Sequence, residues 1–251
     1  MRRFRAVFSL AVLLALAMVQ AVAQDIASFE KRTTVKVLKN GLTVLLCERP
    51  EAPVFSFFTI VDAGSAQDPQ GQSGMAHMFE HEAFKGTSRI GTTDYAKEKI
   101  ALEKVDKAWE AYDREDRREN GRDAKKVAEL KTAFDNAVKD ANQYVIQNRF
   151  GEIIEREGGV GLNASTSMDS TQYFYSLPVN RFETWAYLES SRFRTPVLRE
   201  FYKERDVVHE ERRLRTDSSP IGKLVEQFMS RPIPRILTGD PAWAGHLNWT
   251  T

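Results

Sequence analysis

A single cysteine, Cys47, is present among the 251 residues of this sequence. One cysteine cannot form an internal disulfide, so the folded chain must be held together by its core or by a bound metal. Cys47 ends the apolar run VLLC. This setting favours a buried residue of a strand over a reactive nucleophile.

The chain also lacks an excess of either charge. Its 36 basic and 35 acidic residues leave a formal net charge of +1 at pH 7. Proteins that bind nucleic acid usually present a basic patch or a strongly basic composition. We therefore expect no nucleic-acid partner. The hydrophobic fraction of 42% is sufficient for a substantial core.

Long hydrophobic runs are confined to the N-terminus. The basic start MRRFR precedes the apolar run VFSLAVLLALAMV, and AVA at 21–23 precedes polar residues. This order is typical of a secretory signal peptide, and the run is short for a membrane-spanning helix. We predict that residues 1–23 are cleaved, and favour this over an uncleaved membrane anchor. The mature protein is then expected in the periplasm or outside the cell, with no membrane association.

Strand patterns dominate the first part of the mature chain. Residues 33–49 alternate apolar and polar side chains around Asn40-Gly41, a dipeptide that strongly indicates a β-hairpin. Residues 54–64 predict a third strand. A helix is expected to begin near Ser73.

A different composition covers residues 95–157. This segment is rich in Lys, Glu, Asp, Arg and Ala, and its apolar residues recur at helical spacing on both sides of Asn120-Gly121. It predicts two long amphipathic helices joined by a turn at that dipeptide. A helical hairpin packed on itself is favoured over a coil dedicated to a partner protein.

The remaining segments return to mixed structure. Residues 158–178 predict two strands that flank a Met-Asp-Ser turn. Asn180 and Glu183 have the spacing of a capping box, which predicts a helix from that point. A last helix is expected over about 199–216. Beyond about Met229, prolines and glycines predict an irregular tail.

Two of the four histidines, His77 and His81, stand four residues apart in HMFEHEAFKGT. Residues i and i+4 of a helix share a face, so the two imidazoles can converge on one zinc ion. Glu80 can reach a water on that metal and act as a general base without binding the metal itself. The alternative is a pair of unrelated surface histidines.

The flanks of this motif favour the metal site. Apolar residues surround the helix on nearly all sides, so we expect the helix to be buried. Buried polar groups need partners. One bound cation would serve the two histidines together with the acids Glu80 and Glu82.

A catalytic zinc usually has three protein ligands and one open position, so a third ligand must come from another segment. His209 and His246 are candidates by residue type. The glutamates of KERDVVHEERR fit better, because Glu204 and Glu211 share one helical face with apolar residues. Acids on an apolar face need a cation. Glu210 and His209 lie off that face, and we expect Glu210 at the surface and His209 at the surface or behind a ligand.

Together these segments resemble the pitrilysin/insulinase family of zinc metallopeptidases. H-x-x-E-H is the inverzincin signature, and GMAHMFEHEAFKGT resembles the active-site helix of that family. An Asn-Gly hairpin precedes the helix, and GLNASTSMDSTQYFYSLP and ERDVVHEE follow it, as in the family. The resemblance covers about residues 30–225. It implies an α+β fold with a mainly antiparallel sheet packed with helices, and the order of the expected elements points to the same class.

The resemblance also implies a role for each matching residue. His77 and His81 match the two zinc-binding histidines of the family, and Glu211 matches its distal zinc ligand. Glu80 matches the general base. Glu204 matches a second acid that supports the catalytic site. One zinc ion per chain is implied.

Two further residues, Asn163 and Ala164, match a family segment on a sheet edge. At such an edge a substrate peptide adds as an extra strand through main-chain hydrogen bonds. The helical hairpin, about 99–150, resembles an insertion found in some secreted bacterial members. The resemblance thus divides the mature chain into an N-terminal catalytic domain at 24–229 and an irregular tail at 230–251, where the chain is either truncated or completed by another polypeptide.

The expected function is that of a secreted or periplasmic zinc-dependent endopeptidase. It would hydrolyse peptides or unfolded segments, with Glu80 activating a zinc-bound water. Family members add a second homologous half that closes around the peptide, and these residues do not contain it. We therefore expect a second half as a separate chain or through a homodimer. The alternative is a subunit or truncated fragment of a two-part peptidase, inactive without that half.

Overall fold

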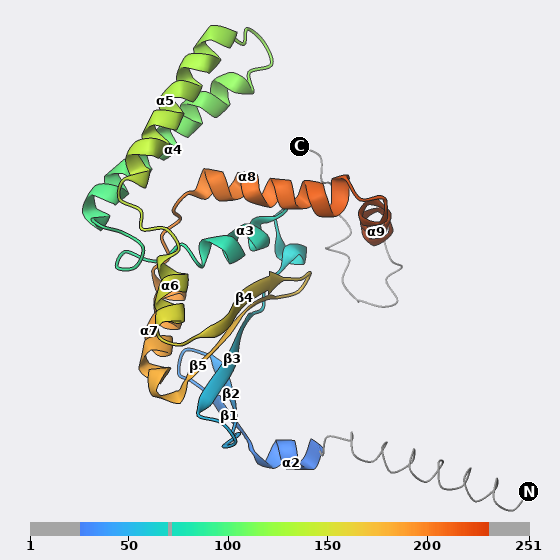
Figure 1. The fold of residues 1–251 in the computed structure, drawn as a ribbon. Helices are drawn as coiled ribbons and strands as arrows, with labels where there is room; N and C mark the ends of the chain where they lie inside the picture. Colours follow the sequence, from blue (N-terminus) through green and yellow to red (C-terminus); the bar gives the residue numbers. More distant parts are fainter. Residues whose placement is uncertain (1–25, 70–71, 231–251) are drawn as a thin grey trace, which may run out of the picture. The chain divides into compact units, whose positions relative to one another are not determined.

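A computed structural model describes residues 26–69 and 72–230 of the chain (Figure 1). It divides into two compact units, Met1–Pro53 and Val54–Thr251, which are considered separately. The signal peptide predicted at 1–23 and the tail beyond Ser230 lie outside the described residues. No helix within the described ranges is both long and apolar enough to cross a lipid bilayer.

The first unit contains the predicted hairpin. Helix α2 (Ile26–Lys31) precedes strands β1 (Thr33–Val37) and β2 (Thr43–Cys47), which pair antiparallel. Gly41 has a φ of 88°, a left-handed conformation that glycine adopts without strain, so the Asn40-Gly41 prediction is confirmed. Cys47 does lie on a strand, but it is partly exposed. The prediction of burial was wrong because no second layer covers this hairpin within the described part of the unit.

The second unit is built around a three-stranded antiparallel sheet. Strands β3 (Val54–Val61), β4 (Val160–Thr166) and β5 (Thr171–Pro178) have the order β3-β5-β4, so β4 forms one edge. The central strand β5 turns every second side chain inward, and these inward side chains are buried. This alternation is the pattern expected of a sheet with one covered face.

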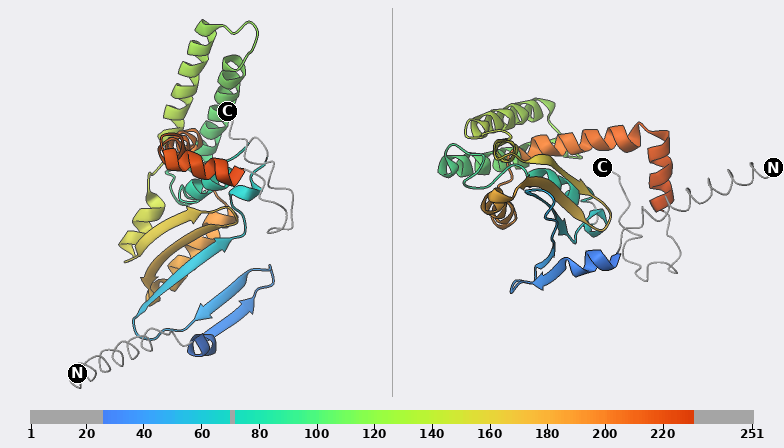
Figure 2. Two further views of the ribbon diagram at one scale, coloured as in Figure 1. Left: turned by 90° about the vertical axis from the view of Figure 1, so that its right-hand side faces the viewer. Right: turned by 60° about the horizontal axis from the view of Figure 1, so that its bottom comes forward.

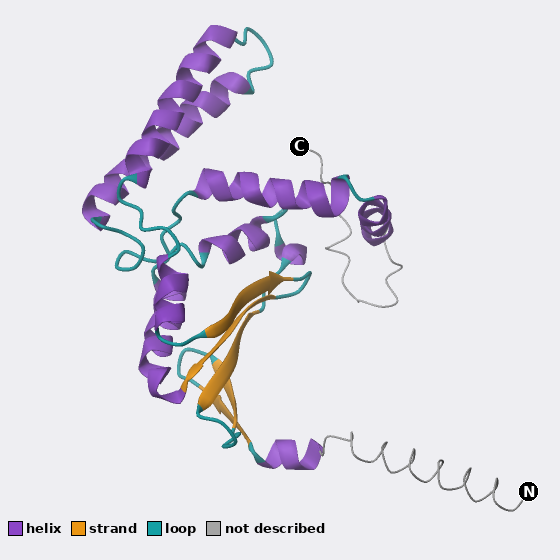
Figure 3. Ribbon diagram, viewed as in Figure 1, coloured by secondary structure: helices purple, strands orange, loops and turns teal. Residues whose placement is uncertain are grey.

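Two helices cover that inner face, α6 (Arg149–Arg156) and α7 (Phe182–Arg194) (Figure 3). The core between them and the sheet consists of buried residues from all three elements, namely Phe150, Ile154, Tyr175, Leu177 and Leu188, together with Ile90. The predicted capping box at Asn180 was wrong. Asn180 lies inside a 3-10 turn, and α7 begins after Arg181 with no side-chain cap.

The predicted helical hairpin is present as α4 (Tyr95–Asp116) and α5 (Ala124–Asn142), which lie side by side (Figure 2). Its core contains Val105 and Phe134. Helix was expected as far as residue 157, but α5 ends at Asn142. After α5 the chain pairs with the loop that precedes α4, where Ile146 N–H donates to Gly91 O, and α6 then begins at Arg149.

The elements that carry the candidate site are α3 (Met75–Glu82) and α8 (Phe201–Arg212), which lie side by side (Figure 1). A π-helical turn (Arg213–Asp217) continues α8, in agreement with the helix predicted over about 199–216. It leads to α9 (Pro220–Ser230), which leaves at an angle to α8 (Figure 2). Helix α3 was expected to be buried all round, but Phe79 is 53% exposed because no described element covers that side.

Candidate metal centre and active site

Three side chains from two helices converge at one point. His77 and His81 lie one turn apart on α3, with their ring centroids 4.9 Å from each other. Oε2 of Glu211, on α8, lies 3.5 Å from Nε2 of His77, and its Oε1 lies 3.8 Å from Nε2 of His81. Each of the three residues offers one possible ligand atom, a ring nitrogen or a carboxylate oxygen. These three atoms all lie within 4.8 Å of one another.

These distances suit a zinc ion. Ligands about 2.0–2.1 Å from a tetrahedral zinc lie about 3.4 Å from one another. Oε2 of Glu211 is buried and accepts no hydrogen bond from any described residue. Nη2 of Arg215 approaches it to 3.1 Å, but as an ion pair and not in hydrogen-bonding geometry. A buried carboxylate oxygen without a donor and two imidazoles together form a donor set that zinc prefers.

The other candidates for the third ligand lie elsewhere. His209 is exposed on α8, and Glu210 is exposed and paired with Arg213. Both were predicted off the site face. His246 lies outside the described residues. Among the described candidates, Glu211 is the one that lies within reach of both His77 and His81.

Glu204 contacts the candidate metal ligand His81 through the ring nitrogen that does not face Glu211. Its Oε2 lies 3.1 Å from Nδ1 of His81, so an Nδ1–H donates to the carboxylate and leaves Nε2 directed toward Glu211. This hydrogen bond raises the pKa of His81 against the opposing effect of burial. The same bond is the main reason that the pKa of Glu204 is lowered to about 2. Such an outer carboxylate fixes the tautomer and the ring orientation of a metal ligand.

His77 has the opposite electrostatic setting. Burial lowers its pKa, and the neighbouring His81 lowers it further. Glu80 and Glu211 oppose this shift, with smaller effects. A lowered pKa favours the neutral imidazole, which is the form that binds a metal.

Glu80 is held by a residue that the sequence analysis did not identify. Thr166, the last residue of β4, donates its hydroxyl hydrogen to Oε2 of Glu80. Thr171, opposite it on β5, lies within 3.3 Å of the same hydroxyl and itself donates to Ala63 O. The available signal was strand alternation, because Thr166 falls two residues after Ala164 and therefore shares its face.

The predicted substrate edge is indeed a free edge within the described sheet. Asn163 and Ala164 lie on β4, which pairs only with β5. Oδ1 of Asn163 accepts a hydrogen bond of 2.9 Å from the N–H of Ala164. An edge N–H is thus occupied by a neighbouring side chain.

A cavity of about 490 Å³ joins the two parts of the site. Its lining includes Glu80 and His81 of α3, Asn163 and Ala164 of β4, and Phe84, which follows α3. Glu80, His81 and the edge strand β4 therefore border the same space.

Glu82 does not join this group. The sequence suggested that it would share a cation with Glu80, but it is not one of the three converging ligands. Its side chain is buried, with 1% of the residue exposed, and neither carboxylate oxygen has a hydrogen-bond partner within the described residues. Burial raises the pKa of Glu82 to about 8, against an opposing effect of Lys85.

Comparison with known proteins gives a consistent set of matches. The model of the insulinase family, peptidase family M16, matches residues 43–117. The zinc protease PqqE of Helicobacter pylori is 30% identical over 196 residues, which cover 77% of this chain and 32% of that protein. The mitochondrial-processing peptidase subunit beta of Lentinula edodes is 42% identical over 57 residues, 23% of this chain and 12% of that one.

A solved structure agrees with these matches. The crystal structure of a protease from Helicobacter pylori superposes with a TM-score of 0.53 and 28% identity. It covers 79% of this chain, which corresponds to 35% of that protein. This chain therefore spans about a third or less of the length of these relatives.

Proposed function

Because this chain belongs to the pitrilysin/insulinase family of zinc peptidases, we propose that it is a zinc-dependent endopeptidase acting on peptides or unfolded segments. The observation that carries the proposal is the convergence of His77, His81 and Glu211 beside Glu80 and a free sheet edge. Metal ligands, a general base and a peptide-binding strand are the parts that such a hydrolase requires.

The residues divide the chemistry between them. A zinc ion at this site would polarise the scissile carbonyl and lower the pKa of water. Glu80 takes a proton from the attacking water and delivers it to the leaving amine. Thr166 holds one oxygen of Glu80 in place, so the other oxygen remains available for that proton. Glu204 orients His81 through the hydrogen bond to its Nδ1.

The substrate binds as an added strand along β4. Its main chain pairs with the free edge, so the side chain of Asn163 must release the N–H of Ala164 when the peptide arrives. Recognition through the main chain tolerates many sequences. The cavity beside Phe84 provides room for a substrate side chain next to the scissile bond.

Location and assembly are parts of the same proposal. The order of basic, apolar and small residues at 1–23 supports export to the periplasm or beyond the cell. The match to the Helicobacter pylori zinc protease covers most of this chain but only about a third of that relative. This supports a second homologous half that works together with residues 24–229 as the catalytic domain.

The test is peptide hydrolysis by the mature chain, from Gln24 onward, with zinc and a mixed set of quenched fluorogenic peptides. Glu80→Gln should reduce turnover by about 10²-fold or more, since general base catalysis contributes that much. It should still bind zinc, measured by metal analysis after dialysis. Removal of the metal with a chelator should abolish turnover, and added zinc should restore it.

Glu210→Gln is the matched control, because Glu210 is an exposed acid of α8 that does not contact the metal-binding residues. It should retain full turnover. Equal turnover by Glu80→Gln and the wild type would contradict the role of Glu80. A folded, zinc-loaded chain without turnover would favour the alternative, a part that is inactive without its second half. A sizing column would then show whether the chain is monomeric.

A further inference from the structure

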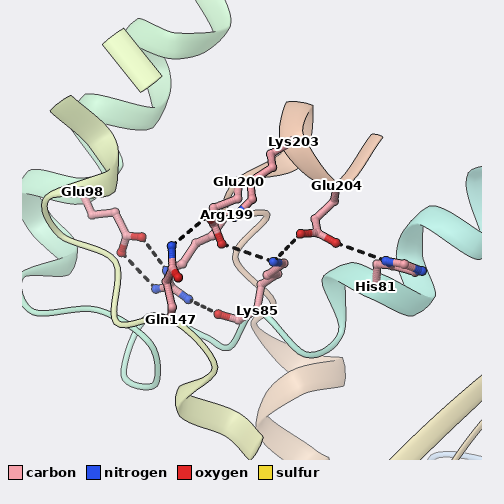
Figure 4. Close-up of polar contacts among 8 residues, drawn as sticks. All are labelled: His81, Lys85, Glu98, Gln147, Arg199, Glu200, Lys203 and Glu204. Atoms are coloured by element: carbon pink, nitrogen blue, oxygen red, sulfur yellow. Dashed lines mark hydrogen bonds and ion pairs between the residues drawn. The ribbon is translucent and has the colours of Figure 1, made fainter. Parts of the chain in front are cut away.

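Lys85 connects the end of the metal-binding helix to the start of α8. It lies three residues after Glu82, the last residue of α3. Its Nζ donates to Oε1 of Glu204 at 2.6 Å and to Oε2 of Glu200 at 3.2 Å (Figure 4). One ammonium group therefore bridges two carboxylates that stand one helical turn apart.

The two oxygens of Glu204 have different partners. Oε1 accepts from Lys85, and Oε2 accepts from Nδ1 of His81 (Figure 4). A carboxylate held at one oxygen cannot rotate freely about its terminal bond. The ammonium of Lys85 thus restricts the direction in which Glu204 presents its other oxygen to the imidazole.

The backbone of Lys85 is itself fixed. The guanidinium of Arg199, which is fully buried, donates to the carbonyl oxygens of Lys85, Thr87 and Ile90. The same guanidinium pairs with the carboxylate of Glu98 at the start of α4. The side chain of Lys85 therefore extends from an anchored turn, so only this side chain has to be ordered when it bonds Glu204.

Shielding from water distinguishes this bridge from an ordinary surface ion pair. The side chains of Glu200 and Glu204 are 5% and 11% exposed, and that of Lys85 is 21% exposed. Exposed ion pairs contribute little to the free energy of folding, whereas partly buried ion pairs interact more strongly. Removal of one partner of a partly buried pair leaves an unpaired charge, which is costly.

We propose that Lys85 is a positioning residue of the metal centre, which acts through Glu204 to hold the imidazole of His81 in the orientation that binds the metal. The inference rests on the proposed zinc site. It predicts an effect of Lys85 on the zinc affinity of the site, although the hydrogen bonds of its Nζ go to Glu200 and Glu204 and not to His77, His81 or Glu211.

The test is the zinc affinity of the mature chain, measured by competition with a chromophoric chelator. Lys85→Met should weaken zinc binding by about 3- to 10-fold, somewhat less than the roughly 10- to 100-fold loss typical for a residue that contacts a ligand directly. Lys85→Arg retains a cation and should recover most of the affinity. The absorption spectrum of the cobalt-substituted protein should change in Lys85→Met and return toward the wild type in Lys85→Arg.

Lys203→Met is the matched control. Nζ of Lys203 donates to Oε1 of Glu200 at 2.9 Å, but its side chain is largely exposed and no bond to Glu204 is present. This variant removes a lysine from the same cluster without loosening Glu204. Its zinc affinity should stay within about twofold of the wild type, as expected for an exposed ion pair.

A double-mutant cycle separates positioning from a general loss of structure. In a Glu204→Gln background, Lys85→Met should cause little further loss of zinc affinity, because the two residues act in series. Independent, additive losses would overturn the proposal, as would a folded Lys85→Met protein with wild-type affinity. If Lys85→Met does not fold, Lys85→Gln serves the same cycle.

The two proposals fail in different ways. If the wild-type chain does not bind zinc, the metal site itself is wrong, and the role of Lys85 is wrong with it. If the wild type binds zinc and the lysine variants bind equally well, only the positioning role is overturned.

Discussion

Thr166 donates its hydroxyl hydrogen to Oε2 of Glu80, although the two residues are 86 positions apart in the chain. Thr166 ends the edge strand β4, and Glu80 lies on α3. The bond therefore ties the candidate general base to the strand on which the substrate is proposed to bind. This contact, as well as the helix, therefore determines where the carboxylate of Glu80 lies relative to β4.

Thr166→Val is expected to reduce peptide turnover by about 10-fold, because general base catalysis depends on the position of the carboxylate. Zinc affinity should be unchanged, since Thr166 contacts none of the three ligands. Turnover and zinc binding of the purified variant provide the two measurements. Thr132→Val makes the same substitution on the exposed surface of α5, where the hydroxyl bonds only Ala128 O, and should have no effect. A loss of zinc from Thr166→Val would contradict the assignment.

The helical hairpin packs against the helix that carries Glu204 and Glu211. The ring of Tyr202 lies 4.7 Å from that of Trp109 and 5.2 Å from that of Phe134, and its hydroxyl donates to Asp106 at 3.0 Å. These contacts are on the side of α8 away from the metal-binding residues. The sequence favoured a hairpin packed on itself, and the structure adds that it also supports α8.

Tyr202→Ala should therefore weaken zinc binding by several-fold, with a loss of stability of about 3 kcal/mol for the removed aromatic packing. Tyr202→Phe retains the rings in contact and should bind zinc as the wild type does. Tyr112→Ala is the matched control, because Tyr112 packs on Trp109 and Phe134 within the hairpin. Equal zinc affinities for Tyr202→Ala and Tyr112→Ala would show that the hairpin does not position α8.

The buried ion pair of Arg199 and Glu98 is expected to make a large contribution to the free energy of unfolding. Breaking a buried ion pair by removal of one partner costs about 3–5 kcal/mol, because the remaining charge is left without a partner. Arg199→Met should reduce the free energy of unfolding by this amount in urea denaturation. Arg117→Met removes one partner of an exposed pair with Asp113 and should cost less than about 1 kcal/mol. Similar losses in the two variants would contradict the importance of burial.

Glu82 should make the metal-free protein less stable as the pH rises. Its pKa is raised from 4.5 to about 8 by burial, so the folded state keeps a proton that the unfolded state releases. Stability falls with pH wherever the folded state binds more protons, which for Glu82 is the window between these two values. The melting temperature of the metal-free chain should decrease across this window. Glu82→Gln should be more stable at the upper end and should remove this slope, whereas Glu210→Gln should retain it.

The parts of the site that the sequence predicted are those set by local geometry. His77, Glu80 and His81 lie on one helix, where the rise and the turn per residue determine which side chains share a face. Glu204 and Glu211 share a face of α8 for the same reason. The hairpin at Asn40-Gly41 and the pairing of β4 with β5 were also predictable, because turn chemistry and strand alternation are local properties.

The errors and omissions have a common cause. The burial of α3 and of Cys47 was overestimated, since burial depends on which elements cover a surface and not on the composition of the segment. Asn180 has the spacing of a cap, but the chain enters α7 through a 3-10 turn. Thr166 and Lys85 were missed because their partners, Glu80 and Glu204, lie in distant segments.

The sequence by itself determined the metal-binding motif, the order of the elements and, through resemblance, the family. It could not determine how α3, α8 and β4 approach one another, because no local rule sets the distance between segments that are far apart in the chain. That packing decided that Glu211 meets both imidazoles while Glu204 stays behind His81. It also brought Thr166 to Glu80 and Lys85 to Glu204, since such contacts form only when the core between the sheet and its helices is complete.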